Sequence, residues 1–216
     1  MGLVKRAIDA LSRSREDMRR HRRATLARRR LSTFPRPYQL NIGCGQVRFE
    51  GWVNADIDVS SPAVDIVWNA CDRFPIEDGS CSLIYNEHFL EHLPVQQGVA
   101  FLGECHRLLQ PGGVLRIAMP SLEEAIRHYV DNDWERQPWL AQYDCSWIAT
   151  RAQCINIVFR EWGHQWLYDR EELHRRMREA GFATIDDCQI GQSSVPQLAN
   201  RETRSESILI CEGKKE

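Results

Sequence analysis

An apolar run that ends in Gly-x-Gly constrains the fold of this 216-residue chain more than any other feature. The run is LNIGCG at Leu40–Gly45, and a second short run, Gly51–Asp56, follows it and ends in an acid. The first glycine permits a tight turn after a buried strand, and the second removes a Cβ that would keep a ligand away from the backbone. An acid at the tip of the next strand accepts hydrogen bonds from ribose hydroxyls in nucleotide-binding α/β folds. Both Asp56 and Asp58 could take that role.

Length and composition limit the other possibilities. The chain is long enough for one domain with a substantial core. It has no run of 18 apolar residues and no signal-peptide h-region, so we expect a cytoplasmic protein without a membrane span. None of the eight cysteines forms a C-x-x-C pair, and several lie inside apolar runs. We therefore interpret them as small buried residues in a reduced protein, not as a zinc site or a disulfide framework.

A basic arm, residues 1–36, precedes an acidic body. The arm carries 12 basic and three acidic residues, a net charge of +9, and the remainder carries −11. An apolar stripe at helical spacing begins at Leu3 and includes Leu11. This helix could dock on its own domain or on a dimer mate, lie on a membrane surface, bind nucleic acid, or stay solvated. Docking or homodimerisation is the interpretation we favour, membrane or polyanion contact is second, and nucleic acid is not an expected partner.

Beyond the glycine loop, short apolar runs alternate with a helical pattern, which is typical of an α/β fold. The final two runs predict an antiparallel pair at the sheet edge. The predicted elements are strands at 63–68, 81–85 and 114–120, a helix at 95–109, and the terminal pair at 182–190 and 205–211.

With these elements in this order, the chain resembles class I S-adenosylmethionine-dependent methyltransferases of the "type 11" kind. The resemblance covers residues 38–211 and is carried by an ordered set of segments: LNIGCG, FPIEDGSCSLIYNEHFLEHL, ECHRLLQPGGVLRIAMP and GHQWLYDREELHRRMREAGF. It implies a Rossmann-like sheet of seven strands over residues 37–216. Within that family the chain looks most similar to small methyltransferases of polysaccharide and glycan biosynthesis, including mycobacterial ones that act on methylated mannose polysaccharides.

The resemblance also implies which residues bind S-adenosylmethionine. The glycine loop would lie under the methionine part, the acid after the second strand would hold the ribose, and two residues after the third strand would lie near the adenine. The implied cofactor set is Asn41, Gly43, Cys44, Gly45, Asp56, Asn69, Ala70, Asn86 and His92. The chain departs from the family in two ways: the third glycine is absent, and Gly45 to Val53 is too short for a crossover helix. We therefore predict a truncated first βα unit.

Histidines supply the candidate catalytic groups. His88 and His92 are four residues apart after the fourth strand, so a helix there would place them on one face. Such a pair could bind zinc, but no third ligand is spaced to suggest a metal site, and we expect none. For His92, a backbone hydrogen bond at a helix start is the competing interpretation. His88 or His164 is the predicted general base, with the other binding substrate; His164 is preferred, because the cap should deliver the acceptor, and Glu87 would orient the base or replace it. We expect His106, His128 and His174 to be solvated.

Residues 121–165 form an aromatic-rich segment after the fifth strand, where an insertion would cap the ligand-binding edge of the sheet. Its tryptophans and tyrosines could simply form the core of the cap. Flat aromatic surfaces beside polar groups also suit a sugar. The sequence therefore predicts a sugar O-methyltransferase, with an oligosaccharide or small-molecule acceptor and no metal. The alternatives are a methyltransferase for a phenol, an amine or a lipid head group, and a non-catalytic cofactor-binding scaffold.

Overall fold

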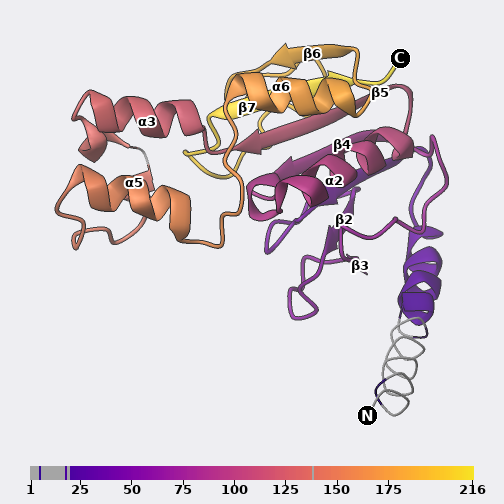
Figure 1. Ribbon diagram of the computed structural model, residues 1–216. Helices are drawn as coiled ribbons and strands as arrows, with labels where there is room; N and C mark the ends of the chain where they lie inside the picture. Colours follow the sequence, from indigo (N-terminus) through magenta and orange to yellow (C-terminus); the bar gives the residue numbers. More distant parts are fainter. Residues whose placement is uncertain (1–4, 6–17, 19, 138) are drawn as a thin grey trace.

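The computed structural model describes residues 5, 18, 20–137 and 139–216, which contain a seven-stranded sheet (Figure 1). Within these residues the strand order is β3-β2-β1-β4-β5-β7-β6. The first five strands run parallel, and β7 is antiparallel to both of its neighbours. The bounds are β1 (Tyr38–Ile42), β2 (Val53–Asp56), β3 (Ile66–Val67), β4 (Cys81–Glu87), β5 (Leu109–Met119), β6 (Thr184–Asp187) and β7 (Leu209–Lys214).

The parallel register brings the ends of three strands together. Asn41 in β1 is level with Asn54 in β2 and with Tyr85 in β4. Since parallel strands share a direction, the loops that follow β1, β2 and β4 open at one edge of the sheet, where ligands bind in open α/β folds. The glycine loop, Asp56 and Asn86 all lie at this carboxyl edge.

Helices cover one face of the sheet. Figure 1 shows α2 (Val95–Leu108) and α6 (Arg170–Glu179) in front of the strands. Phe101 and Leu102 from α2 join Leu173 and Met177 from α6 in the main hydrophobic core. These apolar positions recur at helical spacing, which buries one stripe of each helix and leaves its charged side in water.

The opposite face is covered without a helix after β1. The link between β1 and β2 spans residues 43–52 and contains only turns and bends, so the predicted truncation of the first βα unit is confirmed. Its Phe49 and Trp52 pack with Tyr85 of β4 and with Leu198, which comes from the long loop between β6 and β7. Loop side chains thus replace the missing helix.

The segment 121–165 folds into a helical extension beyond the carboxyl edge (Figure 1). It consists of α3 (Leu122–Val130), the 3-10 turn η2 (Trp134–Arg136), α4 (Trp139–Gln142) and α5 (Arg151–Arg160). Ser121 caps α3 and Thr150 caps α5, because each hydroxyl accepts a backbone N–H of the first turn. Trp139, Ile148 and Cys154 belong to a small core of its own.

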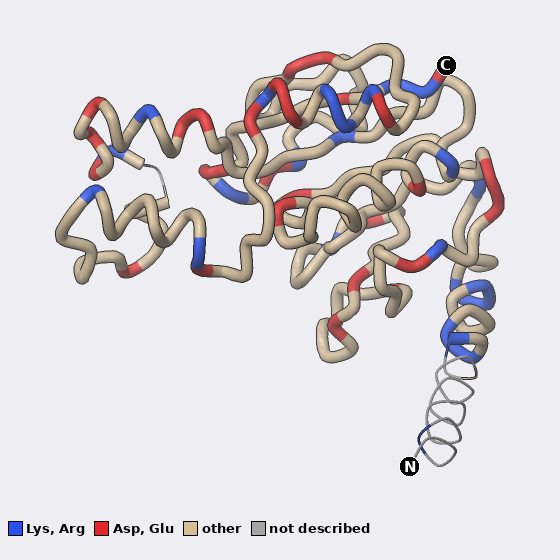
Figure 2. The backbone as a smooth tube through the Cα atoms, in the orientation of Figure 1, with Lys and Arg blue, Asp and Glu red and all other residues tan. Residues whose placement is uncertain are grey.

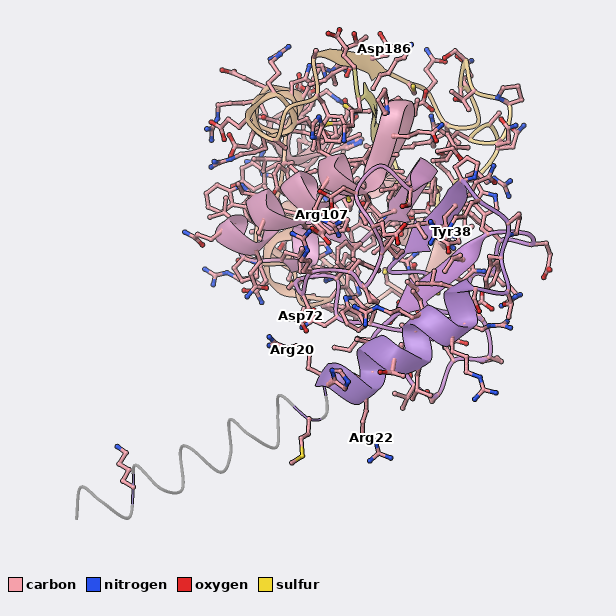
Figure 3. The ribbon with its side chains drawn as sticks, turned by 90° about the vertical axis from the view of Figure 1, so that its right-hand side faces the viewer. Arg20, Arg22, Tyr38, Asp72, Arg107 and Asp186 are labelled. Atoms are coloured by element: carbon pink, nitrogen blue, oxygen red, sulfur yellow. The ribbon has the colours of Figure 1, made fainter. Side chains whose placement is uncertain are left out.

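Residues 20–31 form a basic helix that packs on the domain. Its Ala27 and Leu31 are buried in the main core, and Arg30 donates to Asp65 at 2.7 Å. Figure 2 shows Lys and Arg gathered along this helix. Figure 3 shows Arg20 beside Asp72, 3.7 Å away at the closest atoms, and Arg22 turned away from the domain.

The apolar stripe expected from Leu3 to Leu11 lies outside the described residues. No helix in the described part of the chain has the length and apolarity to cross a membrane.

Several predicted bounds differ from the structure. The strand expected at residues 63–68 is reduced to Ile66–Val67, because a turn precedes it and it pairs only with β2. β5 begins at Leu109, earlier than expected, because Leu109 already pairs with Cys81 of β4, ahead of an irregularity at residues 110–113 where Gly112 has a φ of 78°. The predicted terminal pair is present as β6 and β7, with β7 lying between β5 and β6.

The helix expected to carry both His88 and His92 directly after β4 is not formed, although the helix predicted at residues 95–109 is present as α2. His88 has a left-handed φ of 48°, and only the short 3-10 turn η1 (Leu90–His92) follows it. The reversal at His88 stops any helix from growing out of the strand tip, since a non-glycine residue in that region breaks helical geometry. The argument that His88 and His92 share a helix face therefore fails.

Candidate active site

The glycine loop, residues 43–45, has a backbone conformation that leaves room for a ligand to approach closely. Gly43 and Gly45 have φ values of 71° and 52°, which glycine adopts without strain. The backbone N–H groups of Gly43 and Cys44 both donate to the carbonyl of Ala55 in β2. A Cβ on Gly43 would lie 2.7 Å from the ring of Phe89, so no larger residue fits there. Burial raises the pKa of the Cys44 thiol to about 12, which leaves it as an unreactive thiol.

Asp56 ties this loop to the end of β2. One carboxylate oxygen accepts the N–H of Gly45 at 2.8 Å, and the other accepts the N–H of Asp58 at 2.9 Å. Asp58 instead accepts from the N–H and hydroxyl of Ser60. Of the two acids, Asp56 is therefore the one whose carboxylate contacts the glycine loop.

Asn86 lies at the tip of β4 and is fully buried. Neither its amide oxygen nor its amide nitrogen has a hydrogen-bond partner among the described residues. A buried amide with both ends unpaired is costly unless a ligand or water completes it. This orphaned group fits a cofactor whose polar atoms reach the strand tip.

The other residues of the predicted cofactor set lie in three places. Asn41 turns inward, where its amide donates to Val47 O and to Asn54 Oδ1 and so fixes the shape of the link after β1. Asn69 and Ala70 follow β3, and the side chain of Asn69 accepts the N–H of Cys71 at 3.0 Å. His92 lies on the wall of the pocket described below.

Glu87 anchors a distant loop. Its carboxylate accepts the backbone N–H groups of Thr203 and Arg204 and the hydroxyls of Thr203 and Ser207. Because these donors occupy both oxygens, Glu87 acts here as a clamp that holds residues 203–207 at the carboxyl edge. Arg204 and Glu206 on this loop then line the pocket. Sequence reasoning missed both, because nothing local to residues 203–207 indicates that β4 binds them.

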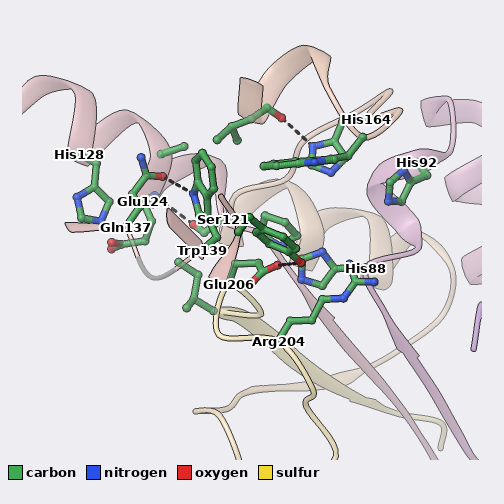
Figure 4. A pocket seen from close by; sticks show the side chains of 16 residues that line it. His88, His92, Ser121, Glu124, His128, Gln137, Trp139, His164, Arg204 and Glu206 are labelled. Atoms are coloured by element: carbon green, nitrogen blue, oxygen red, sulfur yellow. Dashed lines mark hydrogen bonds between the residues drawn. The ribbon is translucent and has the colours of Figure 1, made fainter. Parts of the chain in front are cut away.

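A cavity of about 410 Å³ lies between the carboxyl edge and the helical extension. Figure 4 shows His88, His92 and His164 on one side, and Glu124, Gln137 and His128 on the other. Aromatic rings form part of the wall: Trp162 packs edge-on against Trp139 with centroids 5.2 Å apart, and Tyr143 lies 6.3 Å from Trp162. The volume falls in the range of small-molecule sites.

His88 and Glu91 are buried side chains that lie against each other at the edge of this cavity. The Nδ1 atom of His88 lies 3.3 Å from Oε1 of Glu91, with side chains 4% and 0% exposed. Burial lowers the pKa of His88 to about 3, and the charge of Arg204 adds to the effect. Burial also raises the pKa of Glu91 to about 8. Sequence reasoning missed Glu91, because a glutamate between Leu90 and His92 in a presumed helix carries no signal of full burial.

His164 joins this pair from the loop after α5. The backbone N–H groups of Gln165 and Trp166 both donate to the carbonyl of Glu91, which holds that loop against η1. The rings of His92 and His164 then meet edge to face, with centroids 5.0 Å apart. Burial lowers the pKa of both imidazoles, so both are neutral at physiological pH. The structure therefore brings His88, His92 and His164 together.

The three histidines that we expected to be solvated are packed instead. His128 is buried and pairs with Asp133 at 2.7 Å on the far wall of the cavity. His174 pairs with Asp187 at 2.9 Å. His106 packs edge-on against Phe182. The expectation was wrong because charged neighbours in sequence do not reveal tertiary contacts.

Known structures share this fold. A SAM-dependent methyltransferase of Archaeoglobus fulgidus has 18% identity and a TM-score of 0.51, with 91% of this chain and 94% of that chain covered. A Thermotoga maritima SAM-dependent methyltransferase, described as a possible histamine N-methyltransferase, has 15% identity and a TM-score of 0.50, with 94% and 96% covered. At these identities the likeness shows the fold alone, and it confirms the predicted Rossmann-like methyltransferase sheet.

Sequence comparisons are consistent with that fold. A Mycolicibacterium smegmatis protein, described as a probable S-adenosylmethionine-dependent methyltransferase, is 34% identical over 67 residues, or 31% of this chain. The match spans only 25% of that relative. The family model described as "Methyltransferase domain" matches residues 15–186. Because this match covers most of the sequence, the chain belongs to the methyltransferase domain family.

Proposed function

We propose that the protein transfers a methyl group from S-adenosylmethionine to a hydroxyl of a sugar, within polysaccharide biosynthesis in the cytoplasm. The observation that carries the acceptor class is the mixed wall of the cavity. Trp139 and Trp162 present flat apolar surfaces, and Glu124 and Glu206 present carboxylates to the same space. A sugar matches this combination, since it offers C–H faces to aromatic rings and hydroxyl donors to carboxylates.

The carboxyl edge supplies the cofactor end of the site. The bound cofactor would bring a methyl group on a sulfonium, which is already a good leaving group. Gly43 and Gly45 allow its approach to the backbone, Asp56 has the carboxylate suited to ribose hydroxyls, and Asn86 has a free buried amide. The protein then contributes mainly by holding acceptor and donor in line.

A neutral histidine is the proposed base. A sugar hydroxyl attacks only as its proton leaves, and an imidazole can take that proton. His88 is the member of the trio that follows the strand tip carrying Asn86, and its Nε2 atom has no hydrogen-bond partner in the described part of the chain. Its other nitrogen faces Glu91, which can stabilise the imidazolium as it forms. We therefore propose His88 as base and His164 as an acceptor-binding residue.

An amine acceptor is the second candidate. Aromatic rings and carboxylates together also bind ammonium groups, through cation–π contacts and charge. Against it, Arg204 adds a positive charge to the same cavity. A cationic ligand would have to lie near that guanidinium, whereas a sugar can accept its hydrogen bonds.

The test is methyl transfer from labelled cofactor to a panel of mannose oligosaccharides, other sugars and amines. We expect transfer to a sugar, and alkali-stable O-methyl product by mass spectrometry. His88→Ala should lower turnover by about 10²-fold or more while the cofactor Kd is nearly unchanged. His174→Ala, outside the cavity, is the matched control. Transfer only to amines overturns the sugar proposal, and wild-type turnover in His88→Ala overturns the base.

A further inference from the structure

Three side chains that can ligate one metal ion meet at the wall of the cavity: Glu91, His92 and His164. One donor atom of each lies within 4.8 Å of the other two. Nε2 of His92 is 3.9 Å from Oε1 of Glu91. We propose that this triad binds a single divalent transition-metal ion of the zinc type. The sequence did not predict the site, because His164 is brought to Glu91 and His92 only by the contact between η1 and the loop after α5.

The carboxylate of Glu91 has no hydrogen-bond partner among the described residues, although Nδ1 of His88 lies 3.3 Å from one of its oxygens. Both of its oxygens are buried, and neither accepts a hydrogen bond from any residue that the structure describes. Buried carboxyl oxygens are paired, hydrogen-bonded or bound to metal in stable proteins. Glu87, four residues earlier, differs from Glu91, because its two oxygens accept five hydrogen bonds. A cation beside Glu91 would supply what the protein does not.

The orientation of His164 suits a metal ligand. Its Nδ1 atom lies 2.7 Å from the carbonyl oxygen of Val158. Since a carbonyl only accepts, Nδ1 carries the proton, and Nε2 keeps its lone pair. Histidines that bind metals characteristically donate their other ring N–H to a carbonyl or carboxylate in this way. In His92, Nδ1 faces the backbone at Gly163, since a Cβ added to that glycine would lie 3.6 Å from Nδ1. Nε2 of His92 faces Glu91.

Ligand chemistry selects the class of ion. Two imidazoles and one carboxylate suit zinc and its neighbours, whereas magnesium and calcium prefer oxygen ligands. Donor atoms on one such ion are roughly 3–3.5 Å apart. The donor atoms of the triad are farther apart than this, up to 4.8 Å. The side chain of His92 is 33% exposed, so it can turn toward Glu91 and His164.

Three protein ligands leave one coordination position for a further group, as in catalytic zinc sites. His92 and His164 both line the cavity, so that position can face the acceptor. A hydroxyl bound to such an ion would lose its proton more readily. This use of the ion rests on the proposed function, whereas ion binding itself does not.

A second cluster offers a control. His174, Asp187 and Cys211 also lie within ligand distance of one another. Their atoms already pair among themselves, since Asp187 Oδ1 is 2.9 Å from His174 Nε2 and 3.4 Å from Cys211 Sγ. This cluster therefore has no unpaired carboxylate like that of Glu91, and we do not assign it an ion.

The full chain, stripped with a chelator, should be titrated with Zn²⁺ by calorimetry and with Co²⁺ by visible absorption. We expect one ion per chain. His92→Ala and His164→Ala should each weaken binding by more than about 100-fold, beyond the effect of losing an outer-shell partner. His174→Ala should bind as wild type does. Unchanged affinity in His92→Ala, or a thiolate charge-transfer band with Co²⁺, overturns the site.

A second measurement needs no variant and so does not depend on how a variant folds. Wild-type protein is treated with diethyl pyrocarbonate with and without Zn²⁺, and the modified histidines are located by mass spectrometry. Zn²⁺ should protect His92 and His164 and leave His21, an exposed histidine, unprotected. Equal modification of His92 and His164 in both samples overturns the site. Neither experiment measures methyl transfer, so loss of the metal site and loss of the proposed function are told apart.

Discussion

The carboxylate of Glu87 at the end of β4 accepts a 2.6 Å hydrogen bond from the hydroxyl of Ser207, which follows 120 residues later. Together with the bonds from Thr203 and Arg204, this contact fixes one wall of the cavity to the strand that carries Asn86. The cavity and the tip of β4 are therefore connected directly.

Replacing Glu87 by Ala should release this loop. We expect the free energy of unfolding to fall by about 1–3 kcal/mol, because several donors lose their acceptor. The acceptor KM should rise, while the cofactor Kd changes little. Glu77→Ala, which removes only an exposed pair with Arg36, is the control. An unchanged acceptor KM in Glu87→Ala would show that the loop does not position the acceptor.

Asp56→Ala should weaken cofactor binding by about 1–3 kcal/mol, the value of charge-assisted hydrogen bonds. Asp58→Ala should have a smaller effect, because the Asp58 carboxylate is engaged by Ser60 and does not contact the glycine loop. Calorimetry with both variants decides between the two acids. A larger loss in Asp58→Ala would transfer the ribose role to that residue.

Asp65 should make the fold sensitive to acid. Burial acts to raise its pKa, but hydrogen bonds from Asn54, Arg30 and Arg48 outweigh burial and lower the pKa below 3.8. A carboxyl with a lowered folded-state pKa stabilises the protein above its unfolded pKa, and this contribution is lost as pH falls through the folded value. Asp65→Asn should therefore be less stable than wild type near neutral pH. Urea unfolding should show that the difference in free energy of unfolding between the two proteins shrinks below about pH 4. A difference that does not change with pH would contradict this.

Arg116 in β5 is the largest fully buried side chain among the described residues. It donates to Glu212 at 2.6 Å and to Glu202 at 2.7 Å, and all three side chains are at least 94% buried. Arg116→Ala should lower the free energy of unfolding by about 3–5 kcal/mol, because two buried carboxylates lose their cation. Denaturant unfolding measures this. A loss below about 1 kcal/mol, typical of surface pairs, would mean that water enters the site.

Deleting residues 1–30 should lower the Tm, because it removes the buried Ala27 and the ion pair of Arg30 with Asp65. If the arm serves only to dock on protein, liposome and polyanion binding should not change. Salt-sensitive liposome binding that disappears with the arm would instead support a membrane-surface role.

The sequence predicted the parallel strands and the family well, because buried strands ending in glycine or polar residues are local patterns. The shortened link after β1 followed from a residue count. The site was harder to predict. His88 and His92 both line the cavity, but a left-handed turn and a 3-10 turn place them there instead of the expected helix. Glu91, Arg204 and Glu206 depend on contacts between segments far apart in sequence, which no local pattern records.

The shortened link after β1 also affects the order in which the fold can be completed. Phe49 and Trp52 lie beneath the guanidinium of Arg201, at 4.6 and 5.3 Å, and pack with Leu198. During synthesis from the N-terminus, both aromatic rings leave the ribosome long before these partners exist. All five parallel strands can therefore be present while one face of the sheet still exposes its rings. The chain must wait for its C-terminal segment, and a nascent or C-terminally shortened form should be a substrate for chaperones.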